Sequence, residues 1–360
     1  MNPLDLVRPE LLALNGYSSA RLEAGSAPVM LNANESPWPP AGNQTGLNRY
    51  PEPQPEKLRQ RLAELYGVAT GQLLIGRGSD EAIDLLVRAF CRSGEDAIAI
   101  CPPTFGMYAV CARIQGADVV EIPQAADGLP ELDALLQLPQ RCPNVKLVFL
   151  CSPGNPTGSL LPLAMIEQIA TALRGRALLV VDEAYMEYAE VESPARSALS
   201  LLAAYPHVAV LRTLSKAWAL AGARIGCLLA DAQVIALLRK IMPPYPLPTP
   251  CVEAALQALD APGRALMQQR GALIVAERER MAAALGAMAQ VSEVLPSSAN
   301  FLCVRFVDAV AAQACLAASG IVVRDVSRYP GLQDCLRLSI GSDSENDRVL
   351  AALRTSERAA

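Results

Sequence analysis

Short apolar runs alternate with amphipathic segments between about residues 73 and 230. The runs are three to six residues long and almost entirely apolar, which is typical of strands buried on both faces of a sheet. Strands are expected at 73–75, 97–101, 146–151, 177–181, 208–212 and 225–229. Segments with helical spacing follow several of them, for example AIDLLVRAF and about 161–174. This alternation predicts an α/β fold with a mostly parallel sheet.

The pattern changes at MPPYPLPTP, residues 242–250. Its prolines prevent a continuous helix and predict a stiff connector at a domain boundary. A long helical region follows at about 251–289, with a possible break at Pro262–Gly263, and then a smaller α+β segment. That segment has expected strands at 300–307, 321–324 and 336–340, and expected helices at 308–319 and about 343–356.

The first fifty residues are rich in Pro, Asn and Gly, and they predict one short helix at about 3–14 followed by extended segments. Such an arm cannot form its own core and must lie on something else. We therefore expect a large domain over 46–245. We group the N-terminal arm, 1–45, with a small C-terminal domain, 250–360.

Composition and charge narrow the possible partners of the chain. Its 360 residues carry a net charge of -5 without a block of like charge, which argues against nucleic acid or an anionic membrane surface. No apolar run approaches the roughly 20 residues of a membrane helix, and the start lacks a signal-peptide pattern. The ten scattered cysteines form no CxxC pair. We expect them to be reduced and structural, in the cytoplasm, and we expect no metal site.

The one histidine, His207, precedes an expected strand and is more typical of a structural residue. Proton transfer in an enzyme of this sequence would then use another group, such as lysine or tyrosine. Polar clusters follow five of the expected strands, at 76–80, 104–108, 152–158, 182–185 and 213–216. In open α/β sheets, ligands bind outside the carboxyl ends of the strands.

Lys216 is the only lysine in LRTLSKAWALAGARIG. Thr213 and Ser215 precede it, and Arg224 follows. Lysine amines form Schiff bases with carbonyl compounds, and the hydroxyl and arginine neighbours suit a phosphate. The stretch therefore favours an aldehyde cofactor that carries a phosphate. The alternative is a surface lysine at a strand-to-helix turn.

Two further clusters suit the same ligand. Ser79 and Asp80 open a helix, whose free N–H groups would bind an anion, although both residues also suit helix capping. Asp182 ends an apolar strand, where an unpaired carboxylate is costly, and a protonated ring nitrogen would be a fitting partner. Helix capping is again the alternative. Tyr185 could reach the same place with its phenol.

Four other residues have two interpretations each. Asn155 lies on a turn held by prolines and could donate a hydrogen bond to a cofactor oxygen, or serve the turn alone. Tyr108 could stack on an aromatic ring or pack in the core. Arg324 and Arg337 suit a carboxylate or a phosphate, or could be solvated arginines at a strand edge.

Taken together, VVDEAY, TLSKAWALAGARIG and CSPGNPTG resemble the fold-type-I pyridoxal-phosphate-dependent aminotransferases in order and separation. The resemblance is to the histidinol-phosphate aminotransferase family in particular, and it extends from about residue 7 to the final helix. It is carried by GYSSAR (16–21), LNANESP (31–37), LNRYPEPQP (47–55), RGSDEAIDLLVRAFC (77–91), CPPTFGMYAV (101–110) and CLRLSIG (335–341).

The resemblance implies a fold-type-I structure that binds pyridoxal 5'-phosphate and acts as a cytoplasmic homodimer. It implies amino transfer between L-histidinol phosphate and 2-oxoglutarate, giving imidazole-acetol phosphate and L-glutamate, in histidine biosynthesis. By resemblance, Lys216 binds the cofactor and moves the substrate proton, and Asp182 pairs with the ring nitrogen. Tyr108 would stack on the ring, and Asn155 and Tyr185 would contact its phenolate oxygen.

The same resemblance implies a phosphate site for the cofactor and an acidic-end site for the substrate. The cofactor phosphate would be held by Ser79, Asp80, Ser215, Arg224 and the partner subunit's Tyr50. The substrate's acidic end would be held by Tyr17, Asn34, Arg324 and Arg337.

The chain departs from the family pattern at two positions. Gly154 stands where asparagine is common, and Phe105 where tyrosine is frequent. Neither position carries a required proton transfer. A threonine-phosphate decarboxylase and an aromatic or broad-specificity aminotransferase remain alternatives within the fold. A regulatory protein that lost turnover is a third alternative, against which the intact Lys216, Asp182 and Arg224 argue.

Overall fold

The computed structural model describes residues 2–17, 19–20, 29–42, 46–125, 128–192 and 197–357. In these ranges a seven-stranded sheet has the order β1-β7-β6-β5-β4-β2-β3. Only β7 runs against its neighbours, so the predicted α/β fold with a mostly parallel sheet is confirmed. The strands are β1 (Leu73–Gly76), β2 (Ala97–Ile100), β3 (Asp118–Glu121), β4 (Val145–Cys151), β5 (Leu178–Asp182), β6 (Val208–Thr213) and β7 (Gly226–Leu229).

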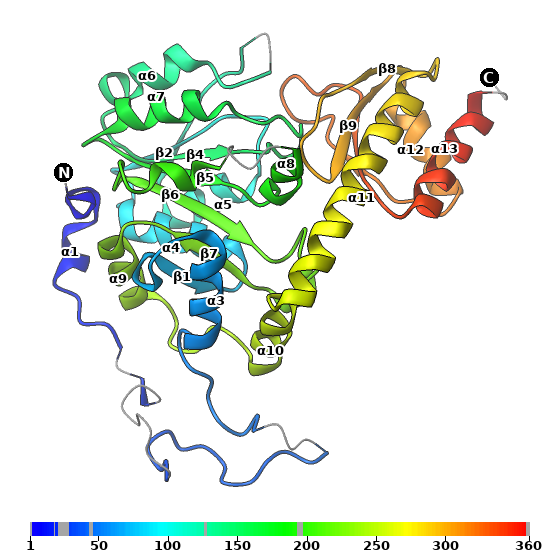
Figure 1. The fold of residues 1–360 in the computed structure, drawn as a ribbon. Helices are drawn as coiled ribbons and strands as arrows, with labels where there is room; N and C mark the ends of the chain where they lie inside the picture. Colours follow the sequence, from blue (N-terminus) through cyan, green and yellow to red (C-terminus); the bar gives the residue numbers. More distant parts are fainter. Residues whose placement is uncertain are drawn as a thin grey trace.

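Helices cover both faces of this sheet (Figure 1). One face packs on α4 (Ser79–Phe90), α5 (Met107–Gln115) and α9 (Ala232–Ile241). The other packs on α3 (Glu56–Tyr66), α6 (Leu132–Arg141), α7 (Leu163–Leu173) and α10 (Thr249–Ala258). Alternate residues of one strand enter the two cores: Val148 and Leu150 face one side and Phe149 the other. This explains why the strands are apolar at nearly every position.

A second sheet, entirely antiparallel, has the order β10-β11-β9-β8. Its strands are β8 (Val291–Val294), β9 (Phe301–Phe306), β10 (Arg324–Asp325) and β11 (Cys335–Ser339). The helices beside it are α11 (Ala261–Gly286), α12 (Ala309–Ala318) and α13 (Asp343–Glu357). Figure 1 shows α11 running from the large sheet to the small one, and it contacts both α8 (Met186–Glu192) and β8.

Three details of the C-terminal half differ from the expectation or refine it. The expected strand at 321–324 is wrong in extent, because only Arg324 and Asp325 pair with β11. Strand β8 was not expected, and its half-exposed VSEV sequence has little apolar pattern. The helical break falls at Leu259–Asp260, where the Asp260 carboxylate accepts a hydrogen bond from Gly263 N and Pro262 occupies the first turn. The break was therefore predicted to within a few residues.

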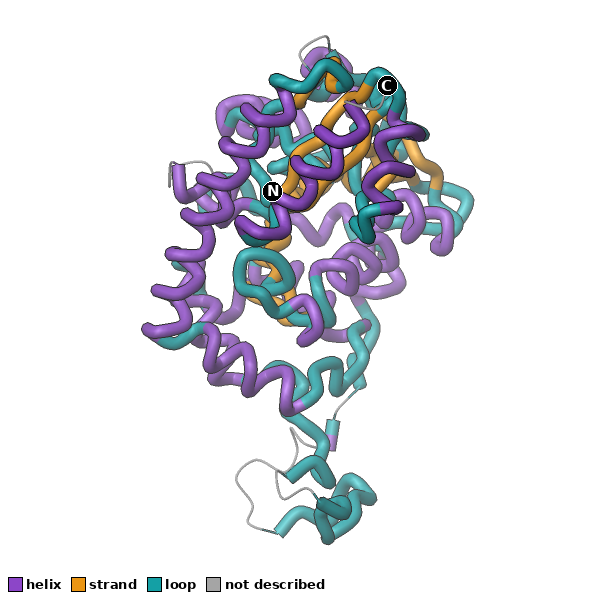
Figure 2. The backbone as a smooth tube through the Cα atoms, turned by 90° about the vertical axis from the view of Figure 1, so that its right-hand side faces the viewer, coloured by secondary structure: helices purple, strands orange, loops and turns teal. Residues whose placement is uncertain are grey.

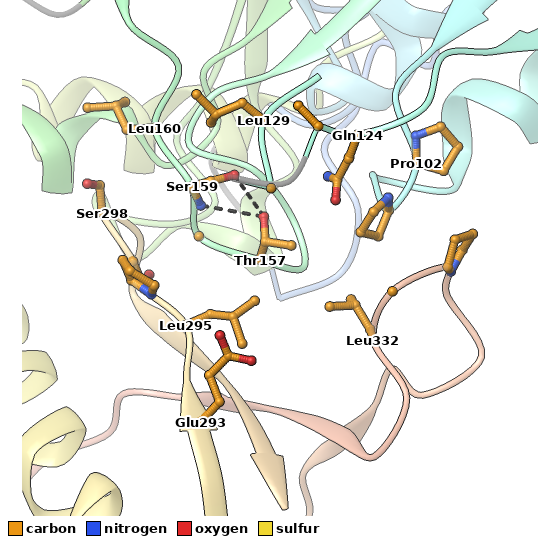
Figure 3. A pocket seen from close by; sticks show the side chains of 18 of the residues that line it. Pro102, Gln124, Leu129, Thr157, Ser159, Leu160, Glu293, Leu295, Ser298 and Leu332 are labelled. Carbon is orange, nitrogen blue, oxygen red and sulfur yellow. Dashed lines mark hydrogen bonds between the residues drawn. The ribbon is translucent and has the colours of Figure 1, made fainter. Parts of the chain in front are cut away.

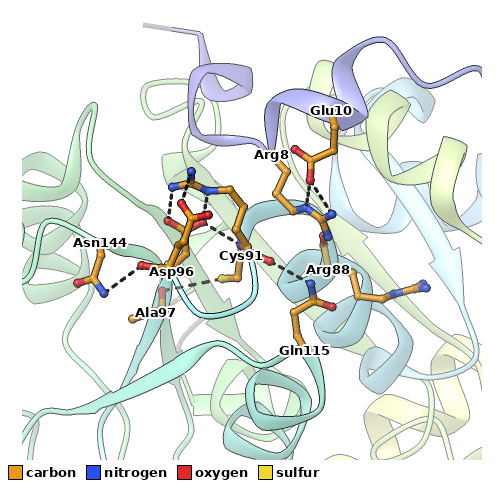
Figure 4. Close-up of polar contacts among 10 residues, drawn as sticks. Arg8, Glu10, Arg88, Cys91, Asp96, Ala97, Gln115 and Asn144 are labelled. Carbon is orange, nitrogen blue, oxygen red and sulfur yellow. Dashed lines mark hydrogen bonds and ion pairs between the residues drawn. The ribbon is translucent and has the colours of Figure 1, made fainter.

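The N-terminal segment is two short helices, η1 (Pro3–Leu6) and α1 (Pro9–Leu12), rather than the one expected. Arg8 is extended at the break, because a residue before proline disfavours the helical conformation. Its amide donates to Ala89 O at 3.0 Å. Its guanidinium donates to Arg88 O, also at 3.0 Å, and Figure 4 shows the two arginines close together. Leu6 and Val7 join the core around α4 and α9. The first residues of the arm therefore pack against the large sheet.

The rest of the described arm, between α1 and α3, extends away from both sheets in the two views (Figures 1 and 2). No helix in the described ranges is long and apolar enough to cross a membrane. All ten cysteines are free thiols. Within the described residues, no cluster of His, Cys, Asp and Glu could hold a metal ion.

Candidate active site

The five polar clusters predicted from the sequence meet in one cavity of about 500 Å³ at the carboxyl ends of the large sheet's strands. Each cluster contributes lining residues, so the prediction of a shared rim is confirmed. The small sheet closes the other side of the cavity. Its lining includes Ser79, Asp80, Phe105, Asn155, Asp182, Tyr185, Ser215, Lys216 and Arg224 from the large sheet, and Arg324, Arg328, Tyr329 and Arg337 from the small one.

Lys216 lies in the turn after β6, and this turn is fixed by its own hydrogen bonds. Thr213 Oγ1 accepts from the amide of Ser215 at 3.2 Å, and Leu214 N donates to Ile225 O at 2.9 Å. The ammonium nitrogen of Lys216 is 5.5 Å from the centre of the Tyr185 ring. Burial, and next the positive charge of Arg337, lower the pKa of Lys216. A larger fraction of the amine is therefore neutral and nucleophilic near neutral pH.

Asp182 ends β5 and is 3% exposed. One carboxylate oxygen accepts from the Tyr108 hydroxyl at 2.7 Å, and the other accepts from Ala184 N at 3.1 Å. Burial raises the pKa of Asp182 to about 6, although both hydrogen bonds act to lower it. No cation in the described part of the chain forms an ion pair with this carboxylate. The arrangement leaves a buried acid in need of a positive partner.

Tyr108 does not occupy the place expected for it. Its side chain is fully buried, its ring stacks on Phe149 with centroids 4.7 Å apart, and it does not line the cavity. The stacking on a bound ring that the resemblance implied is not what this position offers, and the other interpretation of Tyr108, packing in the core, is the one that the structure shows. Phe105, in the loop after β2, lines the cavity instead and meets Tyr108 edge-on at 5.6 Å. Tyr108 faces the sheet because it lies on the inner side of α5, where it holds Asp182.

The start of α4 has a geometry that suits an anion. The helix is capped by Gly78, whose φ of +79° is left-handed, so neither Ser79 nor Asp80 serves as the cap. A side chain at Gly226 would meet the amide nitrogen of Ser79 at 2.4 Å, which keeps the two backbones in close approach. The free N–H groups of the helix, with nearby hydroxyls, suit a phosphate.

Arg224 supplies the positive charge at this site. Its guanidinium donates to Ser215 Oγ at 3.4 Å and forms an ion pair with Asp80 at 3.2 Å. Asp80 therefore orients the arginine at the edge of the anion site. The hydroxyl of Ser215 also contacts Thr213 Oγ1 at 3.0 Å, so the Lys216 turn and the anion site share one hydrogen-bond network.

The small sheet presents two arginines side by side. Arg324 and Arg337 are direct cross-strand partners on β10 and β11, a pairing of like charges that is unfavourable by itself. Neither has an ion-pair partner in the described ranges. Arg337 donates to the Asn155 side-chain oxygen at 2.5 Å and lies 5.3 Å from the Phe301 ring centre. The pair is thus arranged for an anion that the chain itself does not provide.

Asn155 and Tyr185 lie between the two sheets. With its oxygen engaged by Arg337, Asn155 keeps its amide N–H groups for a ligand in the cavity. The Tyr185 ring meets Phe301 edge-on at 5.2 Å, and burial raises the pKa of its phenol. The phenol therefore stays protonated near neutral pH and can donate a hydrogen bond.

Three predicted residues of the arm do not line the cavity: Tyr17, Asn34 and Tyr50. Tyr17 is 72% exposed, and Tyr50 stacks on Tyr245 at 4.4 Å. Conversely, Arg328 and Tyr329 line the cavity but were not expected. Their signal was a basic and aromatic pair in SRYPG, just before CLRLSIG.

A larger cavity of about 1090 Å³ is lined in part by the loops that follow β2 and β4, through residues such as Pro102 and Thr157 (Figure 3). Its lining mixes leucines and prolines with Thr157, Ser159 and Glu293. None of the site residues predicted from the sequence lines this cavity. The chemistry is therefore assigned to the smaller cavity, which holds the buried acid, the lysine and the anion site together.

Comparisons with known proteins agree with this assignment. Residues 11–353 match the family model described as aminotransferase class I and II. The chain is 57% identical to the histidinol-phosphate aminotransferase of Stenotrophomonas maltophilia (strain R551-3), over 99% of this chain and 98% of that protein. It is 55% identical to that of Xanthomonas campestris pv. campestris, with the same coverage.

Among solved structures, histidinol-phosphate aminotransferase from Sinorhizobium meliloti in complex with pyridoxal-5'-phosphate is similar to the chain, with a TM-score of 0.77 and 29% identity. The match covers 86% of this chain and 83% of that one. The expected fold type is therefore confirmed at the level of the whole chain.

Proposed function

The chain belongs to the class I and II aminotransferases, and we propose that it transfers an amino group from L-histidinol phosphate to 2-oxoglutarate. The products are imidazole-acetol phosphate and L-glutamate, and the reaction belongs to histidine biosynthesis. Relatives that share more than half of its residues carry the corresponding name. The observation that carries the proposal is one cavity lined by Lys216, by a buried acid and by two arginines that form no ion pair within the described residues.

Pyridoxal 5'-phosphate fits the large-sheet side of this cavity. The start of α4, with Ser79, Ser215 and Arg224, suits its phosphate. The carboxylate of Asp182, which forms no ion pair in the described part of the chain, suits its ring nitrogen, and the amine of Lys216 suits its aldehyde carbon. Phe105 provides an aromatic face nearby. When bound, this cofactor supplies an electron sink that stabilises negative charge at the substrate Cα.

The residues of the chain then have distinct tasks. Asp182 holds a proton on the ring nitrogen, and Tyr108 and Ala184 N keep its carboxylate in place. Tyr185 and the amide of Asn155 donate hydrogen bonds to the ring oxygen. The neutral amine of Lys216 would take the proton from the substrate Cα and deliver it to the carbon that carries the cofactor's aldehyde. Its lowered pKa suits this work near neutral pH.

Arg324 and Arg337 bind the acidic end of the substrate. That end is a phosphate in L-histidinol phosphate and a carboxylate in glutamate. Guanidinium groups bind both oxyanions through charge-assisted and often bidentate hydrogen bonds. One pair of arginines can therefore serve both half-reactions, since the two substrates occupy the cavity in turn.

A second copy of the chain completes the site in this proposal. The described arm carries large apolar side chains on its surface, including Leu31 and Trp38, which are 87% and 74% exposed. An extended arm with such side chains needs another surface to bury them. In the homodimer, the partner subunit's Tyr50 reaches the site of the cofactor phosphate. Tyr17 and Asn34 of the arm bind the acidic end of the substrate. The ten free thiols support the reducing cytoplasm as its compartment.

Steady-state assays separate this function from the alternatives. The cofactor-loaded protein is given L-histidinol phosphate, phenylalanine or threonine phosphate, each with 2-oxoglutarate. We expect glutamate to form fastest with L-histidinol phosphate and no carbon dioxide to be released from threonine phosphate. Faster turnover of phenylalanine, or carbon dioxide release without 2-oxoglutarate, would refute the proposal.

Mixing inactive variants tests the shared site. Lys216→Ala and Tyr50→Ala protomers are inactive or weak alone, but a mixed dimer has one site with both wild-type residues. After subunit exchange we expect roughly a quarter of wild-type activity, since random pairing gives half mixed dimers with one intact site each. If Tyr50 acts within its own subunit, mixing restores nothing.

A further inference from the structure

The loop between β10 and β11 places two unassigned side chains, Arg328 and Tyr329, in the lining of the cavity that holds Lys216. They come from the small sheet, beside Arg324 and Arg337. Neither is one of the residues proposed above to bind the cofactor, and neither is one of the paired arginines. The loop runs from Val326 to Asp334, between the two strands whose arginines pair.

This loop is a fixed structure. Val326 and Leu332 are buried against Cys303 and Cys335. The guanidinium of Arg305 donates to Gln333 O at 2.5 Å and to Gly331 O at 3.0 Å. Because both ends of the loop are held, Arg328 and Tyr329 are presented to the cavity in a defined position.

Tyr329 lies beside the segment that follows β2 of the large sheet. Its hydroxyl would lie 3.8 Å from a β-carbon placed at Gly106, in the segment between β2 and α5. Backbone bonds fix it on both sides, because Tyr329 N donates to Val326 O at 3.0 Å and Leu332 N donates to Tyr329 O at 3.1 Å. The guanidinium of Arg328 lies 5.6 Å from the centre of the Tyr329 ring. The ring therefore supports the arginine at the mouth of the cavity.

Arg328 has no ion-pair partner in the described part of the chain. The nearest acid in sequence, Asp325, accepts from Ser327 N at 2.8 Å. With Arg324 and Arg337, the small sheet thus brings three guanidinium groups to one cavity, and none of the three forms an ion pair within the described ranges. A carboxylate carries one negative charge, whereas a phosphate monoester carries about 1.5 to 2 near pH 7. Three cations exceed what a carboxylate needs.

We propose that Arg328, supported by Tyr329, is a specificity-determining residue that favours a phosphate monoester over a carboxylate at the substrate's acidic end. This inference rests on the proposed function and deepens it, because it assigns the phosphate preference to one side chain. Arg324 and Arg337 bind either anion, and Arg328 adds the contact that only the larger, more highly charged group uses.

The test compares Arg328→Ala and Arg328→Lys with a control variant, Arg354→Ala. Arg354 is an exposed arginine on α13, the helix beside the small sheet, and it does not line the cavity. For Arg328→Ala, we expect kcat/KM with L-histidinol phosphate to fall about 10- to 100-fold, the effect of losing one charge-assisted hydrogen bond. The loss should arise mainly through KM. With glutamate the change should be under about 3-fold, because a carboxylate does not need the third cation.

Arg328→Lys should recover part of the loss, and Arg354→Ala should match the wild type. Inorganic phosphate should inhibit the glutamate half-reaction of the wild type more strongly than that of Arg328→Ala. Equal losses with both substrates would mean that Arg328 only supports the loop, and no loss would mean that it does not contact the substrate. Either result overturns the inference.

The phosphate inhibition experiment also separates this inference from the proposed function. If the wild type does not use L-histidinol phosphate, the proposed function fails. Inhibition by inorganic phosphate that depends on Arg328 would still support an anion contact at this residue. Inhibition that is unchanged in Arg328→Ala would overturn that contact.

Discussion

The two sides of the cavity are built in different ways. On the large-sheet side, Asp182 is buried at a strand end with two hydrogen bonds, and Lys216 lies in a hydrogen-bonded turn. On the small-sheet side, Arg324 and Arg328 are exposed and form no ion pair within the described residues. The first side is prepared before any substrate arrives. The second receives its counter-charge from the substrate itself.

This difference separates chemistry from selection. Burial favours the neutral forms of both groups, because it lowers the pKa of Lys216 and raises the pKa of Asp182. Such shifts are typical of groups that transfer or hold protons. The exposed arginines contribute charge and geometry, which decide what binds. Variants on the first side should therefore lower turnover with every substrate. Variants on the second side should weaken binding of the acidic end, for both anions at Arg337 and mainly for phosphate at Arg328.

Lys216→Ala tests the prepared side with the largest expected effect. Without the amine, neither cofactor attachment nor proton transfer at the substrate Cα can proceed, and we expect turnover to fall by at least about 10⁴-fold with every donor. The visible absorbance of the lysine-bound cofactor should disappear. Steady-state rates and absorbance spectra measure both. An active variant with unchanged absorbance would contradict the role of Lys216.

Arg337→Ala tests whether the substrate-binding side serves both anions. We expect kcat/KM to fall about 10- to 100-fold with L-histidinol phosphate and with glutamate, because each loses a charge-assisted contact. The two half-reactions are measured separately. Loss in only one of them would show that the acidic ends bind at different places.

Tyr108→Phe asks how far the prepared side depends on one hydroxyl. The Tyr108 hydrogen bond lowers the pKa of Asp182, so its removal should raise that pKa further. Turnover should fall about 10-fold, the effect of one hydrogen bond to a charged group. The acidic limb of the pH profile should move to higher pH, because Asp182 ionises later. Tyr205→Phe, whose hydroxyl contacts Thr171 and Glu167, is the matched control and should leave the profile unchanged.

Asp182→Asn tests the large-sheet side through protein stability, without an enzymatic assay. In the cofactor-free protein, the raised pKa of Asp182 means that folding favours its protonated form. Ionising Asp182 therefore costs more free energy in the folded protein than in the unfolded chain. This cost is absent below the pKa that Asp182 has in the unfolded chain and grows as the pH rises to about 6, so the wild type becomes less stable with rising pH. The asparagine side chain of the variant never ionises. The stability gained by the variant should be about 1 kcal/mol larger at pH 8 than at pH 5.

Denaturant unfolding at the two pH values measures this difference. Glu187 also has a raised pKa, of about 7, but it is present in both proteins, so its contribution cancels in the comparison. A stability gain that does not change with pH would mean that Asp182 is not held at a raised pKa.

The sequence predicted the prepared side well because its residues follow strands that are apolar at nearly every position. Asp182, Lys216 and Asn155 were located by this rule and Arg224 by its place in the Lys216 stretch, and all four line the cavity. The family prediction is confirmed by the match over residues 11–353. For Tyr108 the sequence left ring stacking and core packing open, because spacing does not tell which face of a short helix points at the sheet.

The substrate-binding side was predicted less completely. Arg324 and Arg337 were found on expected strands, but their direct cross-strand pairing depends on register, which the apolar pattern did not reveal. Arg328 and Tyr329 lie in a loop whose shape depends on Arg305 and buried Val326, far apart in sequence. Strand β8 was missed because it is half-exposed, so its VSEV sequence lacks the continuous apolar run that marks the buried strands.

The most direct test of the central claim is the isolated first half-reaction. The protein is loaded with pyridoxal 5'-phosphate, freed of excess cofactor and mixed with L-histidinol phosphate without any oxo acid. The account predicts that the visible absorbance of the bound cofactor is lost as one imidazole-acetol phosphate forms per site, and that 2-oxoglutarate restores it. Unchanged absorbance with L-histidinol phosphate, in a protein that does respond to another amino donor, would contradict it.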